Sequence, residues 1–250
     1  MDIEKVIKRL DDYYSINEFY GAEAHLNYWL KEAKLLNNRN ACLTIINEQI
    51  GLYRTFRSKI NTLAVIDDAL TLVNEFPKDS IAVGITFVNI ATGYETFDMS
   101  DKAIKLYTRA KKILEAALPE DDPFLGSMYN NMAVCYKKLK QYKKADSLIQ
   151  KALKIMTEQG ASRTELAIAY CNMADIIYES SQDLNDERIA DCLRQSKELL
   201  EPNTRKNDAR YIYACRKCSA IFGRLGDKET ENELMNRVTI MINAARNTRI

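Results

Sequence analysis

Apolar residues recur along this chain at spacings of three, four and seven positions, which is the spacing of one face of an α-helix. The clearest run places four apolar residues on one stripe: Tyr129, Met132, Ala133 and Tyr136. A second stripe follows a short polar segment and consists of Ala145, Ile149 and Ala152. Small alanines let two antiparallel helices approach closely, and the larger residues fill the space beside them. The segment from 126 to 159 therefore predicts a tight helical hairpin.

The same template recurs at a nearly constant distance in both directions along the chain. It begins 42 residues earlier at Phe87 and 41 residues later at Tyr170, and both copies carry asparagine and alanine at the same offsets. A period of 41 or 42 residues indicates a solenoid, in which paired helices stack to bury the apolar face that one pair leaves exposed.

Six copies of the template can be placed, and they predict twelve helices, no strands and a single all-α domain. Their approximate bounds are 3–36, 42–76, 84–118, 126–159, 167–201 and 212–243. Proline supports this division, because it costs about 3 kcal/mol inside a helix. All four prolines fall between the copies: Pro77, Pro119, Pro123 and Pro202.

The fourth copy resembles the tetratricopeptide repeat, in the longer form found in kinesin light chain and related cargo and adaptor proteins. The residues that carry the resemblance are Asn130, Asn131, Met132, Ala133, Tyr136, Tyr142 and Ala145. The resemblance implies an α-solenoid that curls into a right-handed superhelix, with the first helix of each pair lining a concave wall. It also implies a non-catalytic module that binds another polypeptide in that groove.

Asparagines stand at the equivalent point of the first helix in several copies: Asn89, Asn131, Asn172 and, in one register, Asn47. Asparagine is disfavoured inside a helix because its side chain competes with the backbone for hydrogen bonds, so something should offset the cost. Its carboxamide can pair with the peptide groups of an extended ligand, a role associated with this position in the kinesin light chain type. The alternative is that each asparagine ties one repeat to the next.

Side-chain selectivity would then come from residues beside these asparagines on the same helices. The candidates are Glu95, Thr96, Asn130, Val134, Lys137, Lys138, Asp175 and Tyr178. Their mixed charge favours a partner of mixed charge with at least one apolar anchor. The basic clamp of the family's chaperone-binding branch is missing, because Lys137 and Lys138 alone do not form it.

Two copies depart from the template. In the second, the segment from 47 to 54 fits either of two registers one residue apart, so Asn47, Glu48 and Arg54 have a special role or simply face solvent. In the fifth, a polar run from 180 to 186 predicts a longer hairpin loop. Lys197 stands there at a position where the template has a small residue, which predicts a second helix that sits further out.

Charge and cysteine content limit the classes of partner and compartment. The 250 residues include 36 basic and 35 acidic side chains, a net charge of +1 that gives no electrostatic case for nucleic acid or membrane. Six scattered cysteines favour reduced thiols and a cytoplasmic protein. The charged N-terminus and the absence of an 18-residue apolar run predict a soluble protein that is not exported.

Catalytic and metal chemistry find no support in the sequence. Cys215 and Cys218 have metal or redox spacing, but both fall on apolar anchor positions and no second such pair exists. The only histidine, His25, is expected on the surface of the first repeat. We therefore predict no catalytic residues, no metal site and no cofactor.

The last helix is apolar on several faces near Val238, Met241 and Ile242. Solenoid ends normally carry a polar cap. This segment therefore predicts a homodimer surface or a docking site, unless the tail from 243 to 250 folds back over it.

Two functions remain open. The first is an adaptor that binds an extended peptide or disordered segment of another protein. The alternative is a regulatory sensor of the bacterial tetratricopeptide type, in which a short peptide binds and changes the pitch of the superhelix. Such sensors usually carry a DNA-binding or effector domain, and none precedes residue 3 in this sequence, so we expect a sensor here to act on a separate effector chain.

Overall fold

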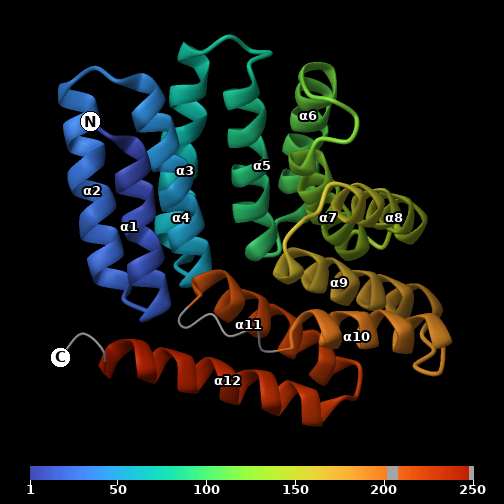
Figure 1. Ribbon diagram of the computed structural model, residues 1–250. Helices are drawn as coiled ribbons and strands as arrows, with labels where there is room; N and C mark the ends of the chain where they lie inside the picture. The colour runs from blue at the N-terminus through green and yellow to red at the C-terminus, as the bar shows by residue number, and fades with distance from the viewer. Residues whose placement is uncertain (202–207, 248–250) are drawn as a thin grey trace. The chain divides into compact units, whose positions relative to one another are not determined.

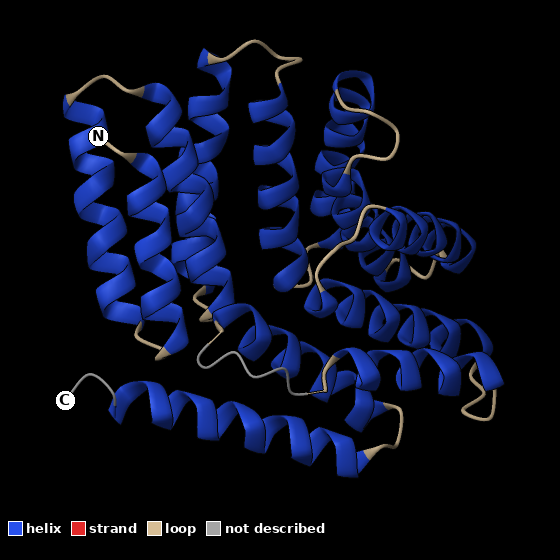
Figure 2. Cartoon of the chain, viewed as in Figure 1, coloured by secondary structure: helices blue, strands red, loops and turns tan. Residues whose placement is uncertain are grey.

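The computed structural model describes residues 1–201 and 208–247, and in these residues it contains only helices and loops (Figures 1 and 2). The first six α-helices are α1 (Ile3–Ser15), α2 (Phe19–Leu35), α3 (Arg39–Thr55), α4 (Lys59–Leu72), α5 (Ile81–Thr96) and α6 (Ser100–Ala117), with a short 3-10 helix η1 (Val73–Glu75) after α4. The next six are α7 (Pro123–Lys138), α8 (Tyr142–Glu158), α9 (Arg163–Ser181), α10 (Glu187–Leu199), α11 (Ala209–Arg224) and α12 (Lys228–Asn247). The predicted all-α fold with twelve helices is confirmed over these ranges.

Consecutive helices pair into hairpins through one recurring turn. In the described chain five of the six hairpins have a three-residue turn, and the middle residue has a left-handed backbone: Asn17, Arg57, Asp98, Lys140 and Gly226. The N–H of the residue after it donates to a carbonyl of the preceding helix, as Gln141 does to Tyr136 over 2.9 Å. This arrangement satisfies the carbonyls left unpaired at the end of the first helix.

The hairpin of α9 and α10 has the longer loop that the sequence predicts. Five residues separate the helices, and the left-handed residue Gln182 ends α9. The Asn185 N–H donates to the Asp183 carboxylate over 2.9 Å, and Asp186 accepts the Arg188 N–H at the start of α10. Short polar side chains therefore replace the backbone pairing of the compact turn.

The chain forms two compact units, residues 1–119 with α1 to α6 and residues 120–250 with α7 to α12. In the first unit the predicted anchors Val6, Leu10, Ala22 and Leu26 are all buried. A close approach also shapes this unit, because a Cβ added to Gly84 would lie 2.8 Å from the Leu114 side chain of α6. Only glycine lets the two helices meet at this distance.

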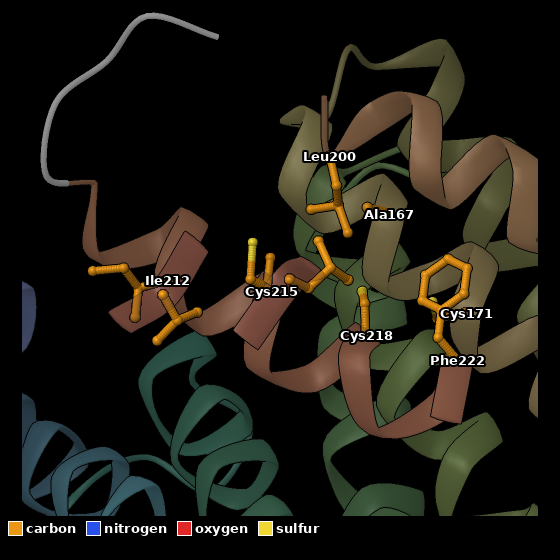
Figure 3. Close-up of a cluster of buried hydrophobic side chains, with 10 residues drawn as sticks. Ala167, Cys171, Leu200, Ile212, Cys215, Cys218 and Phe222 are labelled. Atoms are coloured by element: carbon orange, nitrogen blue, oxygen red, sulfur yellow. The ribbon is translucent and has the colours of Figure 1, made fainter. Parts of the chain in front are cut away.

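The core of the second unit includes a cluster drawn from α9, α11 and α12 and from Leu200, which follows α10. Figure 3 shows Cys171, Cys215, Cys218 and Phe222 directed into it. Val238 is also buried in this cluster, and Met241 and Ile242 pack against it at its edge. The prediction of an uncovered surface at Val238 is therefore wrong, because α11 of the same hairpin covers it.

Two further expectations need correction. The small buried residue of α10 is Ser196, whose hydroxyl donates to the Ala167 carbonyl over 2.9 Å, whereas Lys197 is exposed. The prediction placed the anchor one residue too late, so Lys197 gives no reason to expect a displaced α10. His25 is not a surface residue: it is half-buried, and its Nε2 donates to the Val6 carbonyl over 2.9 Å.

The prolines follow the predicted division with one refinement. Pro123 is the first residue of α7, where the N–H that proline lacks would have no helical partner. Pro202 and the basic residues Arg205 and Lys206 lie outside the described residues. Across the described ranges, no helix has the length and apolar content needed to span a membrane.

Candidate functional site

Every predicted site residue lies on the first helix of a hairpin. Asn47 lies on α3, and Asn89 and Glu95 lie on α5. The residues on α7 are Asn130, Asn131, Val134, Lys137 and Lys138, and those on α9 are Asn172, Asp175 and Tyr178.

In the second unit the asparagines form part of a chain of hydrogen bonds. Asn172 Nδ2 donates to Asn130 Oδ1 over 2.9 Å, which links α9 to α7. Asn130 Nδ2 in turn approaches Asn131 Oδ1 at 3.4 Å. The bond between Asn172 and Asn130 therefore ties one repeat to the next, which was one of the two roles considered for these asparagines. The Asn172 oxygen and the Asn131 amide N–H groups take no part in these bonds.

The charged residues of the second unit compensate one another across three successive first helices. Asp175, which is buried, forms ion pairs with Lys137 of α7 and with Arg224 of α11. Arg224 also pairs with Glu179 and lies over the Tyr178 ring, 5.5 Å from its centroid. Removing either cation would leave a buried carboxylate with less compensation.

Sequence reasoning identified Lys137 and Asp175 as neighbours of the asparagines but missed the contact with Arg224. Arg224 ends α11, and the sixth copy has no asparagine in its first helix to set the alignment. The sequence does contain one signal for this contact. The first helix of the sixth copy ends in an arginine, and the first helix of the fifth copy has acidic residues near its end.

The first unit carries polar groups that lack such compensation. In the described part of the chain Asn89 forms no hydrogen bond. Asn47 Nδ2 donates to Thr86 Oγ1 over 3.1 Å, which links α3 to α5, but Asn47 Oδ1 is buried without a hydrogen-bond partner. Glu95 and Thr96 lie at the end of α5, where the Thr96 hydroxyl donates to the Thr92 carbonyl over 2.9 Å.

The turn geometry decides the register of the second repeat. Asn89 lies nine residues before the left-handed Asp98, and Asn131 lies nine before Lys140. In the second repeat the ninth residue before Arg57 is Glu48. Glu48 therefore occupies the asparagine position in the second repeat, and Asn47 corresponds to Asn130.

Glu48 is half-buried on α3 and faces polar groups of α1. Burial raises the pKa of its carboxyl; the charge of Arg54 lowers that pKa and the charge of Asp11 raises it. Tyr14 lies nearby, and its own pKa is raised by burial and by the Glu48 charge. Among the described residues Glu48 makes no hydrogen bond or ion pair.

The structure offers no metal or nucleophile chemistry at these positions. Within the described ranges no group of three or more His, Cys, Asp or Glu residues could hold a metal ion. Cys215 and Cys218 are both buried, and burial raises the pKa of Cys215 to about 11, so this sulfur stays a neutral thiol. Core packing therefore accounts for the CxxC spacing.

A cavity of about 1100 Å³ in the first unit lies away from the predicted residues. It is lined by the ends of α2, α3 and α4 and by η1, and the Arg39 to Glu75 ion pair at 2.9 Å lies at its edge. Both basic and acidic side chains line it, so its charge does not select a ligand.

Residues 124–201 match the family model described as the tetratricopeptide repeat. This segment covers the hairpins α7–α8 and α9–α10, which carry the hydrogen-bonded asparagines. These two hairpins are therefore similar to tetratricopeptide repeats. A comparison with curated protein sequences finds no match.

Several solved structures share the fold. A Rap protein, solved in complex with Competence and Sporulation Factor, is 16% identical, with a TM-score of 0.67 over 99% of this chain and 66% of that chain. NprR, solved with its cognate peptide NprX, is 16% identical, with a TM-score of 0.60 over 93% of this chain and 66% of that chain. A putative kinesin light chain with nearly identical TPR-like repeats from Podosopora anserina is 14% identical, with a TM-score of 0.54 over 81% and 95% of the two chains.

The turn of the α7–α8 hairpin recurs outside the matched segment. The same three-residue turn with a left-handed centre joins α1 to α2, α3 to α4, α5 to α6 and α11 to α12. Paired helices are therefore present throughout the described residues.

Proposed function

We propose that this chain is a non-catalytic interaction module that binds an extended peptide, or a disordered segment of another protein, on the first helices of its repeats. The observation that carries the proposal is the set of unused amide groups at one repeat position. Asn89 makes no hydrogen bond in the described chain, and the Asn131 amide donates none. Each such group can pair with a peptide N–H or C=O whatever the ligand's side chains.

The residues beside these asparagines would then supply selectivity. Lys137 and Asp175 are already paired with each other, so a ligand meets a largely neutral polar surface there. Val134 and Tyr178 are half-buried on the same helices and offer apolar contact. A segment with a few apolar side chains and little net charge fits this part of the surface.

The alternative is a peptide-sensing regulator that acts on a separate effector. The similarity in fold to NprR, which is solved with its cognate peptide, favours this candidate. A sensor would bind a short free peptide, whereas an adaptor would bind a segment within a larger protein.

The cysteines and the net charge bear on the compartment and on other classes of partner. All six cysteines are free and buried, which supports a reducing compartment such as the cytoplasm. The net charge of +1 supports neither nucleic acid nor a membrane surface as the partner.

The test is selection of displayed random heptapeptides on the purified chain, followed by titration of the selected peptides. The double variant Asn89→Ala with Asn131→Ala should bind them about tenfold more weakly, because several hydrogen bonds of about 1 kcal/mol each are lost. The control Asn236→Ala changes an exposed asparagine on α12 and should bind as the wild type does.

Circular dichroism of the double variant separates binding from folding. Unchanged helicity with weakened binding supports the proposal, whereas unchanged affinity refutes the role of these two residues. Failure of the wild type to select any peptide would refute peptide binding. Affinity capture from native lysate with mass spectrometry then distinguishes short free peptides, which indicate a sensor, from whole proteins, which indicate an adaptor.

A further inference from the structure

One carboxylate of the first unit lacks the compensation that acidic groups receive in the second. Glu48 takes the repeat position that asparagine takes at 89 and 131. It is half-buried, and within the described residues it has neither a hydrogen bond nor an ion pair. Asp175, also on a first helix, is paired by two cations.

A second carboxylate lies among the groups that act on Glu48. Asp11 of α1 adds a second carboxylate whose charge acts on Glu48. The neighbouring Asn47 is directed toward α5, where its Nδ2 donates to Thr86 Oγ1, so it does not compensate Glu48. The one cation acting on Glu48, Arg54, forms no ion pair with it among the described residues.

An uncompensated carboxylate removed from water is unfavourable, and the cost is recovered when a cation with hydrogen-bond donors approaches it. An asparagine at this position would serve a ligand's peptide groups equally as donor and acceptor. A glutamate accepts only, and its full charge discriminates strongly between a cation and a neutral group.

A metal ion does not fit this arrangement. Calcium takes six to eight oxygen ligands, and magnesium requires octahedral geometry. The described residues contain no group of three or more His, Cys, Asp or Glu side chains suited to a metal. An organic cation needs only one carboxylate.

We propose that Glu48 is a specificity site that binds one cationic group of the peptide ligand. The inference rests on the proposed peptide-binding function and adds the chemistry of one ligand position. The cation is a lysine ammonium, an arginine guanidinium or the free ammonium of a peptide N-terminus. The first unit thereby selects a basic ligand residue, while the paired surface of the second unit does not.

The test compares random heptapeptide arrays, one with free and one with acetylated N-termini, on the full-length chain. The wild type should enrich lysine or arginine at one position, and replacing that residue by norleucine should weaken binding about tenfold, the effect expected for a charged hydrogen bond. In Glu48→Gln the same replacement should change affinity less than about twofold. The control Asp67→Asn removes an exposed carboxylate of α4 and should keep the cation preference.

The arms of the array identify the source of the cation. Enrichment in acetylated peptides points to a side chain, and binding limited to free N-termini points to the terminal ammonium; either supports the site. A charge-reversed variant, Glu48→Lys, should select acidic residues instead. Circular dichroism confirms that both variants remain helical.

Three results would overturn the inference. Peptides bound by the wild type with no basic preference would remove the specificity site and leave peptide binding intact. A basic preference that survives in Glu48→Gln would assign the recognition to another residue. Failure to bind any peptide would reject both the inference and the function on which it rests.

Discussion

Two carboxylates on first helices illustrate how environment changes the consequence of one charge. Asp175 is buried but holds Lys137 and Arg224, so its negative charge is balanced within the protein. Glu48 is less buried but has no such partner in the described residues. A free energy penalty therefore remains at Glu48 whenever it is ionised.

That penalty predicts a pH-dependent stability. Burial raises the pKa of Glu48 in the folded state above its unfolded value of about 4.3, so the folded state holds the proton more tightly. The stabilisation is complete below the unfolded pKa and is lost as pH rises through the folded pKa. We expect Glu48→Gln to unfold at a higher temperature than the wild type at pH 7 and at nearly the same temperature at pH 4.

Thermal unfolding followed by circular dichroism at both pH values measures this difference. For a chain of this length each 1 kcal/mol corresponds to a shift of about 2–4 °C. The control Asp67→Asn, at an exposed carboxylate, should show a pH profile parallel to that of the wild type. A Glu48→Gln variant that loses stability at pH 7 would show that the carboxylate is stabilising.

The individual site residues were only partly predictable from the sequence. The asparagines at 89, 131 and 172 could be found because the same template repeats around them. The assignment of Glu48 rather than Asn47 needed the left-handed turn at Arg57. The apolar pattern alone did not decide it, because α3 buries residues on several of its faces. The pairing of Asp175 with Arg224 needed coordinates, because the two lie 49 positions apart.

At the scale of the hairpin, the turn repeats its geometry with different residues. The left-handed centre is glycine only at Gly226; Lys140 and Arg57 adopt the same region with a side chain. For a residue with a Cβ, this left-handed conformation is about 1–2 kcal/mol less stable than a right-handed one, and no packing offsets the difference at an exposed turn.

Lys140→Gly should therefore stabilise the chain. We expect the free energy of unfolding to rise by about 0.5–1 kcal/mol, since relief of backbone strain exceeds the added entropy of the unfolded glycine. The matched control Gly226→Ala places a Cβ in the left-handed region and should destabilise by about 1 kcal/mol. Urea unfolding measures both, and a destabilised Lys140→Gly would show that the Lys140 side chain contributes contacts.

The hairpins themselves were predictable because apolar spacing, small anchors and proline positions all agree along most of the chain. The longer loop of the fifth repeat followed from its polar residues. The anchor of α10 was not predicted, because Ser196 and Lys197 are adjacent and the longer loop removes the fixed offset that distinguishes them.

At the scale of the whole chain, repeat stability should remain local. Each repeat packs mainly on its neighbours, so a defect in one core weakens that region first. Phe222 is buried among residues of α9, α11 and α12, within the unit formed by residues 120–250. Nothing in the sequence marks the division near residue 119, because the same template continues on both sides.

Phe222→Ala should therefore cost about 3–5 kcal/mol and act within the second unit. Amide hydrogen exchange followed by mass spectrometry should show faster exchange in α9 to α12, with α1 to α4 unchanged. The conservative Phe222→Leu should have a much smaller effect. Equal acceleration in both units would show that the chain unfolds as one cooperative body.

Because all six thiols are buried, the folded chain can be labelled at a single introduced cysteine without removing the native ones. An alkylating dye finds no native target until a hairpin opens, because each sulfur is buried. One cysteine introduced at exposed Asn236 would carry the fluorophore alone, while slow labelling of the native six would time the opening of their own helices.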